Sequence, residues 1–347
     1  ELPASLEKPE IIPKDDLLEV GKEVEIEGVT STGGYAPVIF PKRIHIIGPG
    51  VAPVYPSVSL ADLRTGRWDC QPITLEGVVQ YAAPRSEVEQ VQLTLATPHG
   101  RCAAFISKSE GLDLDALVDA SVSLRGVSFA FFNSRGQALE PVVQISSVKD
   151  VKINEPANPD PFSSPEIGED ALQQFSPEGV PLHRRVVEGT VTLSRPGRFF
   201  YIQNGTSGIR ISTRQPDAIP AGTRGRASGF VFMEGDYAGL TEAVFKSLGS
   251  SSSVQPAEVR KDNIVQPVTK IGTTVIYADM DGRQVLMNGR LIKVDQEGGD
   301  TRLFLDSDGS VITARIGGDR QWMNAPLEAG SELQVKAVCA VKLDYGW

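Results

Sequence analysis

One stretch decides the fold: Val186-Val-Glu-Gly-Thr-Val191, followed closely by Phe200-Tyr-Ile-Gln-Asn-Gly-Thr-Ser-Gly-Ile-Arg-Ile211. In the first segment apolar residues surround a central glycine, and a glycine inside a strand costs stability unless the strand must bend sharply. In the second segment Asn204-Gly205 separates two alternating runs, which predicts a tight β-hairpin. A strand bent at its centre and followed by a hairpin is typical of a small, strongly curved β-barrel.

Both segments recur along the chain. The glycine-centred strand returns in Ile73–Val79 and Val285–Leu291, and the hairpin returns in Val91–Phe105 and Leu303–Ile312. A further alternating strand occurs four times: Gly21–Gly28, Asp119–Gly126, Gly222–Gly229 and Gly330–Ala337. Subtracting the last residue numbers of its copies gives steps of 98, 103 and 108 residues. This period is that of a whole domain and is too long for a solenoid.

The elements between these repeats complete the order of strands. A short helical insert is predicted at Leu112–Val118, and a fifth strand at Val142–Val151 and again at Ala243–Leu248. We therefore predict an all-β protein of tandem OB-fold-like five-stranded barrels joined by linkers rich in Pro, Gly and Ser. A row of immunoglobulin-like sandwiches is the competing prediction, which the strand number and the lack of a Cys–Trp–Cys pattern disfavour.

The linkers divide the chain into four units. They are a partial module over 1–50 with only a fourth and a fifth strand, modules over 57–153 and 164–250, and a module over 265–347 that lacks its last strand. Short amphipathic turns after two linkers, at Leu60–Leu63 and Ala171–Phe175, are predicted to pack across the bottom of the next barrel. The incomplete first and last modules suggest a part of a longer protein; the alternative is that they complement each other within or between chains.

Composition narrows the function classes. The chain has 44 acidic and 34 basic residues and a net charge of -10, so its averaged field disfavours nucleic acid as a partner while leaving room for a local basic patch. No stretch approaches the ~20 apolar residues that span a bilayer. Three cysteines are too few for a disulfide scaffold. Cys339 fits a buried strand position, and a disulfide between Cys70 and Cys102 stays open.

No catalytic, metal or cofactor site is predicted. The three histidines, His45, His99 and His183, lie in different modules, and their spacing suggests no metal site or catalytic triad. Asp306-Ser-Asp308-Gly309 starts like a calcium loop but lacks the glutamate that such a loop needs, so it is interpreted as a tight turn. The sequence thus favours a protein that binds a ligand and is not an enzyme.

Candidate ligand-binding residues follow from the way OB barrels bind, through strands two and three and the adjoining loops. Arg195 and Arg198 flank Pro196-Gly197 in a first–second strand loop and suit an anionic group. The aromatic candidates are Phe200 and Phe131, near the binding strands, and Tyr35 and Tyr237, which occupy one place after the fourth strand of two modules. Each tyrosine either closes a turn or contacts a ligand.

Several short sequence segments resemble those of a known protein family. They are Gly33–Val38 with Ile44–Gly48, Val122–Val127 with Phe132–Gly136, and Val186–Gly208. They resemble the repeated OB-like extracytoplasmic sensory region of bacterial two-component sensor histidine kinases and related signalling proteins. The resemblance implies a periplasmic location, an unknown ligand or protein partner, and a membrane-anchored remainder of a longer protein. No kinase motif is present to carry a catalytic residue over.

The leading expectation is a non-enzymatic extracytoplasmic region that senses a ligand or partner for a signalling receptor. Two alternatives remain, an OB-fold protein that binds single-stranded nucleic acid, and an accessory module that binds carbohydrate or a surface assembly. A concentrated basic and aromatic surface would favour the nucleic-acid alternative.

Overall fold

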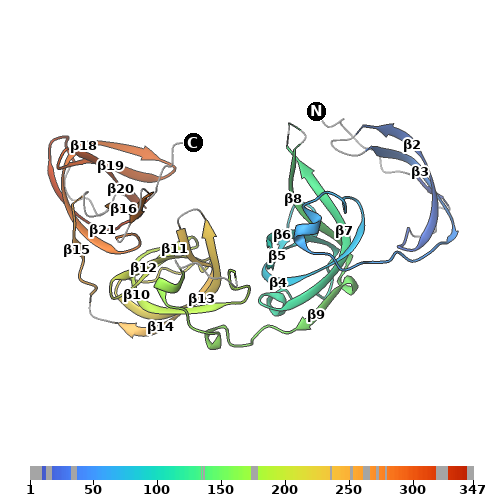
Figure 1. Ribbon diagram of the computed structural model, residues 1–347, viewed down its shortest axis with the longest axis horizontal. Coiled ribbons are helices and arrows are strands. Elements are labelled where there is room, and N and C mark those ends of the chain that lie inside the picture. The colour runs from blue at the N-terminus through green and yellow to red at the C-terminus, as the bar shows by residue number, and fades with distance from the viewer. Residues whose placement is uncertain are drawn as a thin grey trace. The chain divides into compact units, whose positions relative to one another are not determined.

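The computed structural model describes residues 10–12, 18–32, 37–133, 135, 137–172, 179–234, 237–250, 253–260, 266–270, 273–277, 280–317 and 327–341. The chain divides into two compact units, Glu1–Ala157 and Asn158–Trp347, and their boundary lies in the proline-rich linker (Figure 1). None of the helices in the described ranges has the length and apolar character that crossing a membrane requires.

The first unit opens with a three-stranded sheet. Its strands are β1 (Glu10–Ile12), β2 (Lys22–Ser31) and β3 (Val38–Pro49). β2 and β3 form a long antiparallel hairpin, and β1 runs parallel to the free side of β3. Large apolar side chains of this sheet are exposed, among them Ile26, Val29 and Ile39.

The same unit continues into a first closed barrel. Its elements are α1 (Leu60–Leu63), β4 (Pro72–Arg85), β5 (Gln90–Thr97), β6 (Gly100–Lys108), α2 (Leu114–Leu117), β7 (Ser121–Phe132), β8 (Ala138–Ser147), the 3-10 turn η1 (Val148–Asp150) and β9 (Val151–Glu155). The strands pair in the order β4-β5-β6-β8-β7, and β7 returns to β4. β9 adds a further edge to β7.

The second unit begins with a closed barrel of the same order. Its elements are η2 (Pro161–Ser163), α3 (Glu169–Leu172), β10 (Arg185–Arg195), β11 (Phe199–Asn204), β12 (Ser207–Ser212), β13 (Thr223–Glu234) and β14 (Tyr237–Ser250). The closed path is β10-β11-β12-β14-β13.

Strand order and direction identify both barrels as OB-like. In each, strand one pairs with strands two and four, strand five pairs with strand four, and strands three and five run parallel. This is the five-stranded Greek-key barrel of the OB-fold. The predicted fold class, an all-β protein with tandem OB-like barrels, is confirmed.

The glycine in each first strand lies where the barrel bends. A Cβ at Gly77 would lie 2.5 Å from the carbonyl oxygen of Ala96 and 2.8 Å from Leu95 Cγ. A register shift follows two residues later, between Val79 and Tyr81, and equivalent shifts follow Gly189 and Gly289. A β-bulge increases the local twist of a strand, so glycine and bulge together turn the strand around the barrel.

Short helices pack onto the barrel cores, as predicted for Leu60–Leu63; of the turn predicted at Ala171–Phe175, only Ala171 and Leu172 lie within the described residues. Ser59 caps α1, with its hydroxyl accepting from Asp62 N at 3.1 Å and its own N donating to the Asp62 carboxylate at 3.0 Å. Leu60 and Leu63 then enter the core of the first barrel, and Leu172 of α3 enters that of the second. A four-residue helix has little stability of its own, so this burial holds it in place.

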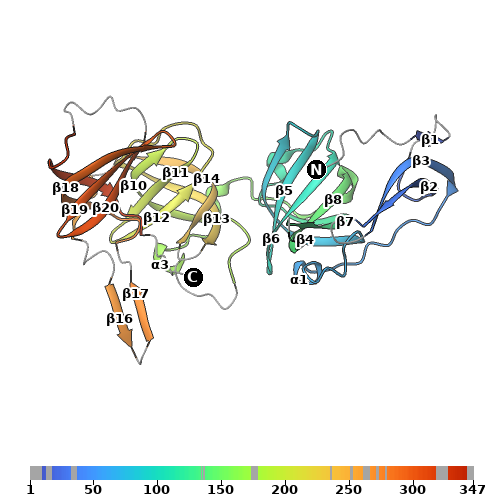
Figure 2. The ribbon, with the colours of Figure 1, turned by 90° about the horizontal axis from the view of Figure 1, so that it is seen from above.

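The last module of the second unit is built on β18 (Gln284–Glu297), β19 (Asp300–Ser307), β20 (Ser310–Gly317) and β21 (Glu332–Val338). They correspond to strands one, two, three and four of an OB barrel and pair in the order β21-β18-β19-β20, and no strand of the described ranges joins β20 to β21. The short β15 (Ala257–Glu258) runs parallel to β18. A hairpin that the sequence did not suggest, β16 (Gln266–Lys270) with β17 (Thr273–Tyr277), projects beside this sheet (Figure 2).

Candidate ligand-binding surface

The outer face of the first barrel, on strands β4 to β6, carries aromatic, amide and basic side chains. Alternation turns Leu93, Leu95 and Ile106 into the core and their neighbours outward. Register then aligns Tyr81 with Thr94, and Gln92 with Phe105. We call this surface face 1, and define it by Tyr81, Arg85, Gln92, Thr94, Arg101 and Phe105.

An arginine and a phenylalanine are paired at one end of face 1. Arg85 is the last residue of β4, and its Cζ lies 5.1 Å from the ring centroid of Phe105. The Arg85 side chain is exposed, the ring is half-buried, and no carboxylate of the described residues forms an ion pair with Arg85. A cation beside an aromatic ring forms a weakly favourable pair that is well suited to binding an anion or a flat ring.

A second arginine lies toward the other end of face 1. Arg101 Nε donates to the side-chain oxygen of the buried Gln80 at 2.6 Å. Burial lowers the pKa of Arg101, but a guanidinium stays charged in proteins. The hydrogen bond to Gln80 fixes the direction of this cation.

The strands of face 1 carry basic side chains and no acidic ones. Residues 78–85, 90–97 and 100–108 contain no Asp or Glu, whereas the turn that joins β4 to β5 contains the exposed Glu87 and Glu89, and the whole chain has a net charge of -10. Because fields near a surface are set by the closest charges, a ligand that lies across the strands of face 1 meets arginines, and one that extends over the turn meets these two glutamates. The sequence analysis allowed for a local basic patch, and the pairing of β4, β5 and β6 brings its arginines onto one face.

The second barrel repeats this construction. Arg195 ends β10 as Arg85 ends β4, and its Cζ lies 5.9 Å from the centroid of the Phe199 ring. Arg210 Cζ lies 4.7 Å from the same centroid, and Tyr201 meets Phe199 edge to face at 5.8 Å. We call this outer surface face 2, and define it by Arg195, Phe199, Tyr201, Gln203 and Arg210.

The last module covers both ends of face 2. Arg195 Nη1 donates to both carboxylate oxygens of Asp300, at 2.9 and 3.0 Å, and the two side chains are only 19 % and 23 % exposed. At the other end, the side-chain oxygen of Gln203 accepts from Gln284 N at 2.8 Å, and Gln203 is 5 % exposed. At face 1, by contrast, Arg85 is exposed and forms no ion pair among the described residues.

The last module carries a related but neutralised surface. Lys293 Nζ and Arg302 Cζ lie 4.5 and 5.8 Å from the centroid of the Phe304 ring. Arg302, however, pairs with Asp295 at 3.4 Å and with Glu297 at 2.8 Å. The local carboxylates balance the basic charge there, so this surface is a weaker site for an anion than face 1.

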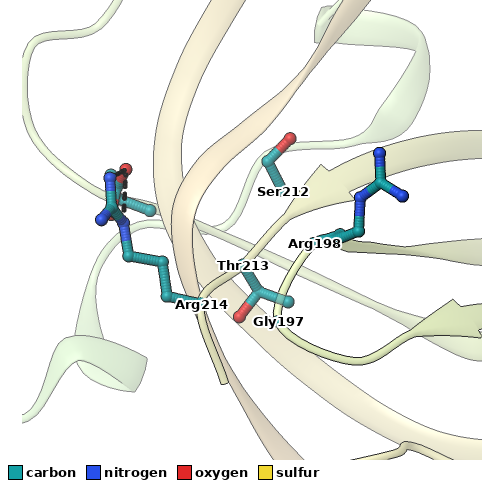
Figure 3. Close-up of a pocket in the computed structure, with 6 residues that line it drawn as sticks. Gly197, Arg198, Ser212, Thr213 and Arg214 are labelled. Atoms are coloured by element: carbon teal, nitrogen blue, oxygen red, sulfur yellow. Dashed lines mark hydrogen bonds and ion pairs between the residues drawn. The ribbon is translucent and has the colours of Figure 1, made fainter. Parts of the chain in front are cut away.

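The two arginines predicted to bind an anion have different surroundings. Arg195 lies on face 2 and pairs with Asp300, as described above. Arg198 is exposed and lines a shallow pocket of about 290 Å³ with Gly197, Ser212, Thr213, Arg214 and Glu242 (Figure 3). Arg214 is held by Glu242 at 2.9 Å, and the Arg198 side chain points away from it. The guanidiniums of Arg198 and Arg214 therefore do not converge on one ligand group, and that of Arg195 is held by Asp300.

Of the four aromatic candidates, the structure describes the side chain of Phe200 alone. Phe200 is fully buried in the core of the second barrel, with its ring 5.4 Å from that of Phe245. Its prediction as a ligand contact is wrong, because alternation places the neighbouring Phe199 and Tyr201 outward instead. Phe131 lies in β7 and Tyr237 in β14, but the described residues do not include their side chains, and Tyr35 lies outside the described ranges altogether.

Sequence reasoning missed the residues of face 1. Tyr81, Arg85, Arg101 and Phe105 all lie at outward positions of the predicted first strand and hairpin. The signal was available as alternation counted outward from the buried positions, together with the absence of acidic residues. Clusters of consecutive aromatic residues, which guided the prediction, mark the core as often as the surface.

Metal ligands do not gather in the part of the chain that the structure describes, where no group of three or more His, Cys, Asp or Glu side chains is placed to hold an ion. The Asp306–Gly309 segment is a tight turn, in which Gly309 N donates to Asp306 Oδ1 at 2.9 Å. Both Asp308 and Gly309 adopt positive φ there, as a two-residue hairpin turn requires.

The three cysteines are free thiols, so the disulfide that the sequence left open is not formed. Burial raises the pKa of Cys102 to about 12 and that of Cys339 to about 11. Partial burial and the neighbouring Asp69 also raise the pKa of Cys70, but this thiol is exposed, whereas the other two are buried. Since the thiolate is the reactive form and must be reached by the reagent, we expect Cys70 to be the first thiol to react with a thiol-specific disulfide reagent in the native protein at neutral pH. All three should react after unfolding. Three fast thiols in the native protein would contradict this burial.

Comparisons with known proteins give similar strand arrangements only. No family model matches the chain, and no curated protein does. Among solved structures, asparaginyl-tRNA synthetase from Pyrococcus horikoshii is 14 % identical, over 36 % of this chain and 28 % of that chain, with a TM-score of 0.24. The Entamoeba histolytica asparaginyl-tRNA synthetase in complex with asparaginyl-adenylate is 10 % identical, over 53 % and 54 %, with a TM-score of 0.25.

A murine DNA-binding protein bound to double-stranded DNA is 13 % identical, over 52 % of this chain and 98 % of that chain, with a TM-score of 0.24. This chain spans less than two thirds of the synthetase chains that it matches. At these values the likeness extends no further than the arrangement of strands, which the sheet pairings establish independently. The chain is a tandem array of OB-like modules with an open basic and aromatic face on its first barrel.

Proposed function

We propose that the chain is a non-enzymatic binding protein and that face 1 binds a short single-stranded nucleic acid. The observation that carries the proposal is the Arg85–Phe105 pair, open and without a described acidic partner, on the strands through which OB barrels bind. A base offers a flat ring to Tyr81 or Phe105, and the flanking phosphates offer charge to Arg85 and Arg101. Few other ligands combine a flat aromatic ring and a negative charge in one short repeating unit.

The expected stacking energy and number of phosphate contacts predict a modest affinity of face 1 for single-stranded nucleic acid. Stacking of a base on an aromatic side chain contributes about 1–3 kcal/mol, and two phosphate contacts give a salt slope of about -1.4 in log K against log salt for single strands. The net charge of -10 works against association over longer distances. Face 1 is therefore suited to a short segment that stacks, and poorly suited to a long polyanion held by charge.

The test is fluorescence anisotropy of a labelled short oligothymidylate at low and moderate salt. We expect Phe105→Ala to weaken binding about 5- to 150-fold, the range set by the stacking energy. Arg85→Ala should halve the salt slope, from about -1.4 to about -0.7. Arg125→Ala is the matched control, because Arg125 is an exposed arginine on β7 of the same barrel and outside face 1.

Three outcomes separate the binding classes. Equal weakening by Arg85→Ala and Arg125→Ala would show unspecific charge attraction and would remove face 1 from the proposal. No binding at low salt would remove nucleic acid as the ligand. Binding to a glycan array, lost in Phe105→Ala, would assign the same face to a carbohydrate instead.

A second candidate function rests on the family resemblance. We propose that this region is the extracytoplasmic sensory part of a membrane-anchored signalling protein, with face 1 as its ligand surface. The phrases around Val186–Gly208 support this context. The complete reading frame tests it: a membrane-spanning segment followed by a kinase or other output domain is expected, and a reading frame without either would reject it.

A further inference from the structure

We infer that face 2 is a second, latent site for the same class of ligand, which the last module keeps covered. The inference rests on the proposed function for the ligand class, since it assigns that class to a second face. Its structural basis is separate, because the similar side chains of the two faces and the covering contacts are both observed in the described residues.

Faces 1 and 2 present the same kinds of side chain from the first three strands of their barrels, although the phenylalanine comes from the third strand in face 1 (Phe105, β6) and from the second strand in face 2 (Phe199, β11). Arg85 and Arg195 each end a first strand, and each lies beside a phenylalanine ring, at 5.1 and 5.9 Å. Face 2 also has a tyrosine and a second arginine, Tyr201 and Arg210, around Phe199, as face 1 has Tyr81 and Arg101. By composition, face 2 has at least as much aromatic and basic surface for a base and a phosphate as face 1.

The last module occupies the position that a ligand would take. Asp300 gives Arg195 a carboxylate that accepts two hydrogen bonds, which is how a phosphate would engage the same guanidinium. At the far end of the hairpin, the backbone of Gly282 contacts that of Gly208, where a Cβ would overlap the Gly282 carbonyl. The module thus contacts face 2 at both ends of β11–β12.

The covering contacts named above are an ion pair, a hydrogen bond and a backbone contact, and none of them is part of a shared apolar core. Among the described residues, the buried apolar cluster of the second barrel shares no member with the two clusters of the last module. The second barrel also closes on itself without help from the last module. Polar interfaces between domains of one chain separate more readily than apolar ones, and an anion that competes with Asp300 for Arg195 would favour separation.

The experiment uses the full chain and counts sites for the labelled oligothymidylate. We expect one site in the wild type and two in Asp300→Ala, because Arg195 is then free to meet a phosphate. Gly208→Ala should also give two sites by a different route, since its methyl group displaces Gly282. Arg195→Ala is the matched control: it breaks the same ion pair but removes the cation, so its second site should be at least about 5-fold weaker or undetectable.

Hydrogen exchange of β11 and β12 reports the cover directly, and we expect faster exchange in Asp300→Ala and Gly208→Ala. If hydrogen exchange of β11 and β12 becomes faster in both variants but the number of oligothymidylate sites stays at one, face 2 is not a binding site. If exchange rises in neither, the last module is not a releasable cover. Both results overturn the inference while leaving face 1 intact.

The double variant Phe105→Ala with Asp300→Ala separates this inference from the proposed function. Face 1 is then weakened, so the remaining site should be face 2 alone. If the wild type binds nothing and Asp300→Ala binds one oligonucleotide, the proposed role of face 1 fails and that of face 2 stands. If no variant binds, the ligand class itself is wrong for both faces.

Discussion

Phe200→Ala is expected to lower the free energy of unfolding of the second barrel by about 3–5 kcal/mol, the usual cost of removing a buried phenylalanine. Phe200 has no exposed surface and packs edge to face against Phe245 in the barrel core. Its removal leaves a cavity that a closed barrel of short strands cannot collapse to fill. Denaturant unfolding followed by far-ultraviolet circular dichroism measures the loss.

Phe199→Ala is the matched control for this prediction. It removes the same side chain one residue earlier, from the outer face, where the ring is only half-buried and contacts Arg195 and Arg210. We expect a clearly smaller loss of stability. If Phe199→Ala proved the more destabilising of the two, the register of β11 would have to be shifted by one residue.

Gly77→Ala is expected to lower the stability of the first barrel by about 1–3 kcal/mol, although alanine usually stabilises a strand relative to glycine. The added methyl group would lie 2.5 Å from the Ala96 carbonyl oxygen, which belongs to the barrel wall and cannot rotate away. The strand must then straighten or β5 must move outward. Thermal unfolding of the variant, compared with the wild type, measures the effect.

Gly48→Ala provides the control for backbone entropy, because Gly48 also lies within a strand and an added methyl group there would have no atom within 4 Å. This variant should be neutral or slightly stabilising. Equal destabilisation in both variants would mean that close approach at Gly77 is not what the barrel requires.

Local sequence signals account for most of the barrel fold. The repeated glycine-centred strands, the Asn204-Gly205 and Asp308-Gly309 turns and the apolar alternation are such signals, and local sterics and hydrophobic burial turn them directly into strands and hairpins. They predicted both barrels and the packing of α1. They failed at Phe200, because adjacent residues of a strand point to opposite faces and the outward residue here is Phe199.

The outward positions of a barrel were also within reach of the sequence, because period-two alternation determines them once one buried residue is known. The strand register adds what alternation cannot give, namely which outward residues of different strands lie next to each other. Phe105 meets Arg85 through the pairing of three successive strands, β4, β5 and β6, and the lack of carboxylates on these strands makes their outer face basic. A net charge averaged over the chain cannot express such a local arrangement.

The sequence by itself thus determined the module, its strand order and which residues alternate outward. Only the tertiary structure decided which of the outer faces is open. That choice depends on Asp300 reaching Arg195, 105 residues away along the chain, and on the backbone contact of Gly208 with Gly282. Such contacts between modules have no periodicity and no turn signal, because they arise from the docking of two finished surfaces. Arg195, which the sequence analysis selected to bind an anionic ligand group, forms an ion pair with the carboxylate of Asp300 in the same chain.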